Sequence, residues 1–166
     1  MDCARAQKSN GNRKHMKIQI GQHDIGGRRT YVIAEIGNNH NGSFERAIEL
    51  IDQALDAGAD AVKFQMRHLD QVYRQRTLRK DGEDLGTEYV LDLLRRFELT
   101  VGEHHQLAKY CTKKGAIYLC TPWDALSVAV LESFGVPAYK VASADLTNLP
   151  LLKCLAQTGK PLILSQ

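Results

Sequence analysis

The stretch YVIAEIGNNHNGSFERAIELIDQALDAGADAVKFQ, residues 31–65, decides the fold. Residues 31–36 are rich in β-branched side chains and stop at a glycine, which predicts a strand. Polar turn residues follow, and Ser43 can cap a helix whose apolar side chains recur at helical spacing. Gly58 ends that helix, and a second apolar strand is predicted at 61–65. A helix between two consecutive apolar strands predicts that these strands pair in parallel.

The same alternation continues to the end of the chain. Four glycines stand one to three residues before a predicted strand, in the left-handed position at which a helix returns the chain to a sheet. The predicted class is therefore α/β with a parallel sheet, and both a doubly wound sheet and the inner wall of a (β/α)8 barrel fit the pattern. Further strands are expected at 116–120, 138–142 and 162–165, helices at 88–97, 100–114, 124–133 and from Thr147 or Asn148 onward, and the glycines are Gly58, Gly115, Gly135 and Gly159.

Composition excludes several classes of protein. The 166 residues are 43% hydrophobic and 25% charged, and no apolar run approaches the ~18 residues of a membrane helix. Residues 1–15 hold four basic and one acidic side chain, which leaves 18 of each sign in the rest, so neither nucleic acid nor a membrane is an expected partner. Residues 1–15 are expected to be a disordered tail or a misassigned start, and residues 16–166 the folded domain.

The four cysteines form no Cys-x-x-Cys pair and have no histidine at zinc-site spacing. Reduced thiols in the cytoplasm are the expected state. A small hairpin is predicted from residues 17–20 and 28–30, and residues 66–86 are predicted to form a long loop. We expect His40 to be a hydrogen-bonded loop residue rather than a metal ligand, and His104 and His105 to lie on the solvated surface of a helix. Trp123 and Phe134 are expected to be packing residues. The basic run of the long loop is expected to be a solvated segment or a lid over an anionic substrate; it consists of Arg74, Arg76, Arg79 and Lys80.

Polar side chains stand toward the C-terminal ends of all five predicted strands. In a parallel α/β protein these positions meet at one end of the sheet, where loops build the active site. A single lysine in a strand is usually an edge residue with its head in water, but two lysines at equivalent heights on separate interior strands favour a ligand site. The side chains are Glu35, Lys63, Gln65, Thr121, Lys140, Ser143 and Ser165.

The charges of this group predict an anionic ligand. Buried ammonium groups need anions, because an unpaired buried charge is strongly destabilising. A phosphate or carboxylate would supply the negative charge, with the hydroxyls of Ser143 and Ser165 as further donors. Glu35 is the only acid among the strand residues and is a candidate for binding a hydroxyl or handling a proton. Asp145 follows closely enough to reach the same end, although an acid near a helix N-terminus also has a purely structural use.

Several motifs in order resemble those of the sialic acid synthase family, from about residue 31 to the end of the chain. They are AEIGNNHNG at 34–42, AGADAVKFQ at 57–65, Thr121-Pro122, PAYKVAS at 137–143, LTNLPL at 146–151 and GKPLILS at 159–165. The resemblance implies a TIM barrel, and because a closed barrel needs eight strands and ~250 residues, the chain is expected to be the N-terminal part of a synthase domain, truncated after about strand 5.

The resemblance also implies a reaction: condensation of phosphoenolpyruvate with an N-acyl sugar of the N-acetylmannosamine or N-acetylmannosamine 6-phosphate type, with release of phosphate. It implies a divalent metal, manganese or magnesium, with ligands outside this chain, and a homodimer for the full-length enzyme. By the same resemblance, Lys63, Lys140, Ser143 and Ser165 bind phosphoenolpyruvate, and Glu35 and Gln65 contact the acceptor sugar. From its place at the end of its strand, Thr121 is expected to bind substrate, and Glu35 and Asp145 are expected to be the catalytic carboxylates.

One motif departs from the family pattern. Known members have Ser-Gly-Glu where this chain has Ser143-Ala144-Asp145, so the second carboxylate is one methylene shorter, which fits a shifted or different sugar. Two alternative functions stay open: a catalytically incomplete fragment that only binds phosphoenolpyruvate or another anion, and a related phosphoenolpyruvate-dependent aldose-phosphate synthase.

Overall fold

A five-stranded parallel sheet is the main element of the structure, a computed structural model that describes residues 18–72 and 85–165. Each strand lies beside the next one in the chain, which confirms the predicted α/β class and parallel order. The predictions for residues 1–15 and for the basic run at 74–80 lie outside the described residues. In sheet order the strands are β3 (Ile33–Gly37), β4 (Ala61–Met66), β5 (Ile117–Pro122), β6 (Tyr139–Val141) and β7 (Leu162–Leu164).

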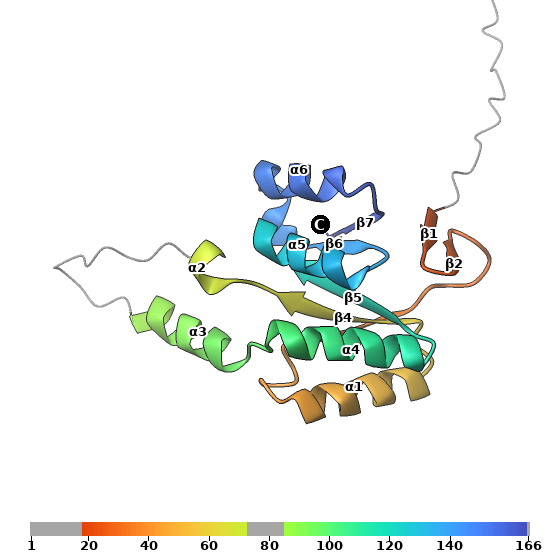
Figure 1. The fold of residues 1–166 in the computed structure, drawn as a ribbon, viewed down its shortest axis with the longest axis horizontal. Helices are drawn as coiled ribbons and strands as arrows, with labels where there is room; N and C mark the ends of the chain where they lie inside the picture. Colours follow the sequence, from red (N-terminus) through yellow and green to blue (C-terminus); the bar gives the residue numbers. More distant parts are fainter. Residues whose placement is uncertain (1–17, 73–84, 166) are drawn as a thin grey trace, which may run out of the picture.

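Helices join consecutive strands (Figure 1), and four of those in the described residues begin at predicted caps. In four helices a side-chain oxygen accepts a hydrogen bond from a backbone N–H of the first turn, and Thr100 forms the predicted capping box with Glu103. Of the two possible caps near residue 148, the chain uses Asn148. The elements are α1 (Phe44–Asp56), α2 (Leu69–Val72), α3 (Leu85–Arg96), α4 (Val101–Lys113), α5 (Ala125–Phe134), the 3₁₀ turn η1 (Ser143–Asp145) and α6 (Leu149–Gln157), with caps Ser43, Thr100, Asp124 and Asn148.

The glycines at the helix ends have the predicted left-handed backbone. Their φ angles are +89° at Gly58, +75° at Gly115, +71° at Gly135 and +69° at Gly159. A side chain at such a φ would crowd the backbone, so glycine is the residue that lets the chain leave each helix and enter the next strand directly. Within the described ranges, no helix is long and apolar enough to cross a membrane.

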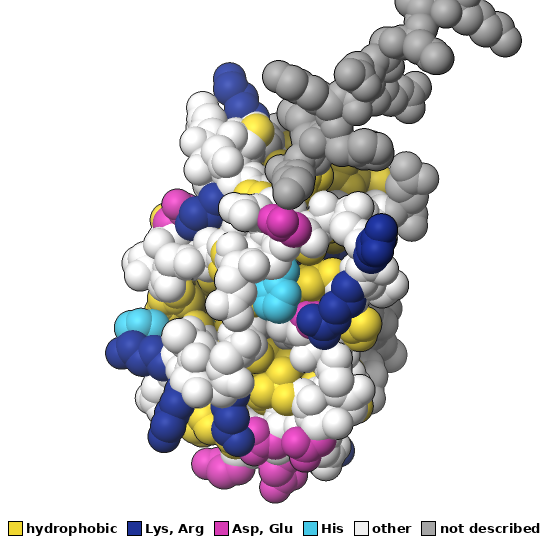
Figure 2. All heavy atoms as spheres, turned by 90° about the vertical axis from the view of Figure 1, so that its right-hand side faces the viewer, with side chains coloured by type: hydrophobic (Ala, Val, Ile, Leu, Met, Phe, Trp, Pro, Cys, Tyr) yellow, Lys and Arg dark blue, Asp and Glu magenta, His cyan; other side chains and the backbone are white. Residues whose placement is uncertain are grey.

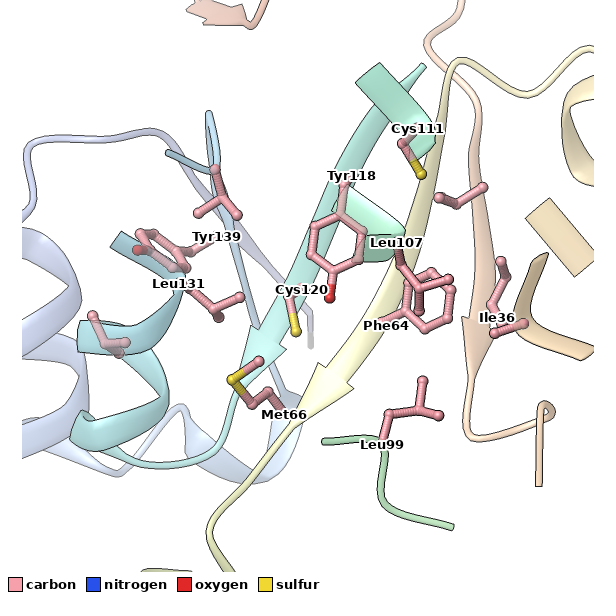
Figure 3. Packing of buried hydrophobic residues seen from close by; sticks show 14 of the residues in the cluster. Ile36, Phe64, Met66, Leu99, Leu107, Cys111, Tyr118, Cys120, Leu131 and Tyr139 are labelled. Atoms are coloured by element: carbon pink, nitrogen blue, oxygen red, sulfur yellow. The ribbon is translucent and has the colours of Figure 1, made fainter. Parts of the chain in front are cut away.

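Side chains of β4 alternate between two apolar cores on opposite faces of the sheet. Phe64 and Met66 face α1, α4, α5 and α6, in the larger core that Figure 3 shows. Phe64 has no exposed surface, and its ring stacks on Tyr118 with centroids 5.4 Å apart. On the other face, Ala61 packs with Leu119 and with Ile20 of the hairpin. On the face opposite the helices, this smaller core covers the end at which the strands begin. Lys63, two residues after Ala61 on β4, lies on the same face.

The predicted hairpin forms, but its second strand is earlier than expected. β1 (Ile18–Ile20) pairs with β2 (His23–Ile25), and residues 28–30 are not a strand. Gly21, at φ +59°, turns the chain at once, so the later Gly-Gly pair is not the turn. The predicted loop at 66–86 is also wrong in part, because α2 occupies 69–72 and α3 begins at residue 85.

The end of the sheet at which the strands begin faces the viewer in Figure 2. Apolar side chains appear there between charged ones (Figure 2). A hollow of about 240 Å³ at this end is lined mainly by apolar groups, among them Ile117, Phe134 and Val136. The groups that could bind an anion gather at the other end of the sheet.

His104 was expected on the solvated surface of a helix, and this prediction is wrong. Only 3% of His104 is exposed, its Nδ1 lies 2.7 Å from the Tyr118 hydroxyl, and its ring meets Phe64 edge-on. Helix α4 turns the face that carries Leu107 and Cys111 toward the sheet, and position 104 lies on that same face. Burial, with a smaller contribution from the charge of nearby His40, lowers the pKa of His104 to about 4.

We expect the stability of the chain to fall in acid because of His104. In the unfolded chain a histidine has its ordinary pKa of about 6.5, so between that value and about 4 the unfolded state binds the extra proton. Stability is therefore lost as pH falls, by about 2 kcal/mol from pH 7.5 to pH 5 for this residue. Urea unfolding at the two pH values measures it: His104→Gln should lose less stability than the unmodified chain. An equal loss in His104→Gln would contradict this assignment.

Candidate active site

A hollow of about 320 Å³ lies at the ends of the strands, on the face opposite the helices. The structure brings together seven of the eight residues predicted for the site, from all five strands or the turns that follow them. Three further residues, Trp123, Ala142 and Ala144, complete the lining. The seven are Glu35, Lys63, Gln65, Thr121, Lys140, Ser143 and Ser165.

Lys63 is the most buried charge of the hollow. Its side chain is 11% exposed, and Nζ pairs with the carboxylate of Glu35, the residue directly opposite it in the β3–β4 register. Nζ also donates a hydrogen bond to Thr121 Oγ1 on β5 (3.3 Å). The side chain of Glu35 is 49% exposed, so about half of it is accessible to solvent. The ion pair offsets the free-energy cost of burying the charge of Lys63 and holds its ammonium group in place in the hollow.

Lys140 supplies the second positive charge. Its ammonium group donates to the carbonyl of Val141 (2.5 Å) and to the hydroxyl of Ser165. Partial burial lowers the pKa of Lys140, the charge of Lys63 lowers it further, and Glu35 acts in the opposite direction. Two ammonium groups thus face one carboxylate, and an anion in the hollow would stabilise the charged form of Lys140.

The chain turns sharply after β6, and this separates Ser143 from Asp145. As predicted, Ser143 already belongs to the turn, η1, and lines the hollow. Asp145 does not line it: the residue is 8% exposed, and its Oδ1 accepts a hydrogen bond from Asn148 Nδ2 (3.1 Å). Asp145 Oδ2 is buried without a hydrogen-bond partner among the described residues. The 3₁₀ turn therefore directs this carboxylate toward the start of α6, and its catalytic role stays a prediction.

Trp123 and Arg67 are members of the site region that sequence reasoning missed. Trp123 was expected to pack, yet it lines the hollow, and the Arg67 guanidinium lies 4.7 Å from the centroid of its ring. The two-residue alternation of side chains along a strand could have identified them. Arg67 stands two residues after Gln65, and Trp123 stands two after Thr121, so each continues the face that already carries a site residue.

Gly37 shapes the hollow because it has no side chain. It lies at a bulge where the β3–β4 register shifts, at φ +54°, and a Cβ there would come within 2.9 Å of Glu35 Oε1 and 3.4 Å of Gln65 Nε2. Both of those atoms belong to predicted site residues. The glycine therefore leaves room for the Glu35 carboxylate beside Lys63.

We expect Gly37→Ala to disturb both stability and the site. The positive φ and the crowding of Glu35 should cost about 1–3 kcal/mol of unfolding free energy and weaken anion binding, as urea unfolding and calorimetric titration with phosphoenolpyruvate would measure. Gly102→Ala is the matched control, because Gly102 lies in α4, where an added Cβ would lie 3.9 Å from Thr100 Oγ1, and this variant should gain stability slightly. Equal behaviour of the two variants would contradict the role given to Gly37.

His40 has the loop role that was expected of it. It is 2% exposed, and its Nδ1 accepts a hydrogen bond from the backbone N–H of Gly42 (3.1 Å). Burial lowers the pKa of His40, while a hydrogen bond with the backbone of Gly37 and the charge of Glu103 act in the opposite direction. In residues 18–72 and 85–165, no three His, Cys, Asp or Glu side chains come close enough together to hold a metal ion, so the described residues do not by themselves fit the expected divalent cation.

Known proteins resemble the chain in sequence and in fold. The sequence model of the NeuB family matches residues 50–166. An uncharacterized protein of Methanocaldococcus jannaschii is 41% identical over 90% of the chain, and the N,N'-diacetyllegionaminic acid synthase of Campylobacter jejuni is 35% identical over 83%. The crystal structure of an N-acetylneuraminic acid synthetase from Leptospira borgpetersenii, solved with citrate, superposes on 89% of the chain with a TM-score of 0.76 and 32% identity.

The chain spans only part of these relatives. It covers 41% of the Methanocaldococcus protein, 42% of the Campylobacter synthase and 48% of the Leptospira structure. The five parallel strands thus correspond to about half of a barrel-type relative. Because the family model matches well over half of the chain, the chain belongs to the NeuB family.

Proposed function

We propose that this chain carries the phosphoenolpyruvate-binding part of a nonulosonate synthase, an enzyme that condenses phosphoenolpyruvate with an N-acyl sugar such as N-acetylmannosamine or its 6-phosphate and releases phosphate. The observation that carries the proposal is the pair of ammonium groups, Lys63 and Lys140, in one hollow beside the hydroxyls of Ser143 and Ser165. Membership in the NeuB family and similarity to a legionaminic acid synthase support it.

The ligand has chemistry that matches the hollow. Phosphoenolpyruvate carries a phosphate and a carboxylate, and each is best bound by ammonium and hydroxyl donors. In the proposed reaction, C3 of the enol attacks the aldehyde carbon of the sugar, water adds at C2, and the C–O bond to phosphate breaks as phosphate leaves. The lysines would hold the two anionic groups and stabilise the charge that passes to the leaving phosphate.

Glu35 has the position for a second role. Its carboxylate pairs with Lys63 but stays half exposed, so it can accept a hydrogen bond from a sugar hydroxyl or take a proton in the hollow. The expected divalent metal would polarise the aldehyde oxygen, and no step given to the residues above depends on it.

Phosphate release tests the proposal. The chain would be incubated with phosphoenolpyruvate, N-acetylmannosamine and Mn²⁺, both alone and fused to the part of the Campylobacter synthase that it does not cover. Release by either protein, dependent on the sugar, abolished by EDTA and restored by Mn²⁺, is the expected result. Binding of phosphoenolpyruvate without release by either protein would favour the anion-binding fragment, and release only with a phosphorylated aldose would favour the aldose-phosphate synthase.

A further inference from the structure

Arg67 makes two contacts that join the ends of β4 and β5. Its guanidinium donates a hydrogen bond to Oε1 of Gln65, two residues earlier on the chain, and it lies over the ring of Trp123, 4.7 Å from the centroid. Gln65 and Trp123 both line the hollow, whereas Arg67 is not among its lining residues. Arg67 therefore contacts two residues that line the hollow without lining it itself.

The chemistry of the guanidinium fixes which way the Gln65 amide points. Arginine has only donors, so the Gln65 atom that faces it must be the carbonyl oxygen. The NH₂ group then points to the other side, where Nε2 lies 3.4 Å from the position that a Cβ on Gly37 would take, and Glu35 Oε1 lies 2.9 Å from the same point. Gln65 thus presents N–H donors beside the carboxylate of Glu35.

A second set of contacts holds this arrangement in place. The backbone N–H of His68 donates to Asp124 Oδ2 (2.8 Å), and the N–H of Trp123 donates to the carbonyl of Met66 (3.0 Å). Asp124 is also the N-cap of α5. The segment from Met66 to His68 is therefore fastened to a helix start, which keeps Arg67 over the Trp123 ring, where the cation–π contact further stabilises it.

We propose that Arg67, seated on Trp123, is a positioning residue: it orients the Gln65 amide so that its NH₂ group donates a hydrogen bond to an oxygen atom of the acceptor substrate. The proposal rests on the proposed function only for the identity of that ligand. The orientation of Gln65 itself is a property of the free chain and is tested without any ligand.

The ligand-free test uses the Gln65 side-chain NH₂ signals in a ¹⁵N–¹H NMR spectrum, identified by their loss in Gln65→Leu. Arg67→Ala should shift these signals, and it should also shift the fluorescence emission of Trp123, which comes from the chain's only tryptophan. Arg67→Lys, which keeps a donor but not the planar group, should give an intermediate change. Arg46→Ala, which removes an exposed positive charge on α1, should change neither signal. Unchanged Gln65 signals in Arg67→Ala would overturn the proposal.

The ligand test is a double-mutant cycle read by Trp123 fluorescence. With phosphoenolpyruvate saturating, N-acetylmannosamine is titrated into the chain, Arg67→Ala, Gln65→Leu and the double variant. Arg67→Ala should weaken sugar binding about tenfold, as the loss of one oriented hydrogen bond does, and should have no further effect when Gln65 is already Leu. Equal effects in both backgrounds would show that Arg67 acts independently of Gln65 and would overturn the proposal. If the unmodified chain binds neither compound, the proposed function fails, and the NMR result alone decides the role of Arg67.

Discussion

Lys63→Met and Lys140→Met should each weaken the binding of phosphoenolpyruvate by at least about tenfold. A hydrogen bond between charged groups contributes about 1.5–3 kcal/mol, which corresponds to about 10–100-fold in affinity. Methionine keeps most of the length of the lysine stem, so the packing of each strand is retained while the charge is removed. Calorimetric titration of the two single variants and of the double variant measures the dissociation constant. The double variant should bind phosphoenolpyruvate more weakly than either single variant.

Control variants separate this effect from a general loss of positive charge. Lys109→Met removes an exposed lysine on α4, on the helix side of the sheet, and should bind phosphoenolpyruvate as the unmodified chain does. Lys63→Met and Lys140→Met should also keep a cooperative unfolding transition, because Glu35, the partner of Lys63, is half exposed and can be solvated. Unchanged affinity in both site variants would remove the basis of the proposed function.

Phe64→Ala should destabilise the chain by about 3–5 kcal/mol, the range for loss of a large buried aromatic side chain. Phe64 is fully buried, stacks on Tyr118 and meets the rings of His40 and His104. Its removal leaves a cavity between the sheet and α4 that the surrounding rings cannot fill. Unfolding in guanidinium chloride measures the loss as a lower midpoint.

The comparison with Lys63 makes the Phe64 prediction specific. The two residues are neighbours on β4 and point to opposite faces of the sheet, so Phe64→Ala should reduce stability much more than Lys63→Met does. Where enough Phe64→Ala remains folded, its affinity for phosphoenolpyruvate should change little. A loss of stability below about 1 kcal/mol in Phe64→Ala would contradict the packing described for this face.

The local patterns that decide the fold are readable in the sequence. Gly58 and Gly135 predict helix ends because few other residues tolerate a left-handed backbone, and Thr100 with Glu103 predicts a helix start because their spacing satisfies two backbone groups at once. The seven residues of the hollow were predictable because the carboxyl ends of parallel strands lie together at one end of the sheet, where ligands bind. Polar residues at these positions therefore indicate a site.

What the sequence did not predict depends on contacts between distant residues. His104 looks like a surface residue until α4 is placed on the sheet beside Phe64. Arg67 and Trp123 are 56 positions apart, and only the β4–β5 register brings the one over the other. Asp145 was expected at the site from its distance along the chain, but the direction of its side chain is set by η1 and by Asn148.

The most direct test of the central claim is a crystal structure of the chain with phosphoenolpyruvate. We expect the ligand in the hollow between β4 and β6, with an oxygen of its phosphate or carboxylate within hydrogen-bond distance of both Lys63 Nζ and Lys140 Nζ, and with the hydroxyls of Ser143 and Ser165 beside it. Phosphoenolpyruvate bound elsewhere on the chain, or in the hollow without contact to either lysine, would contradict the account.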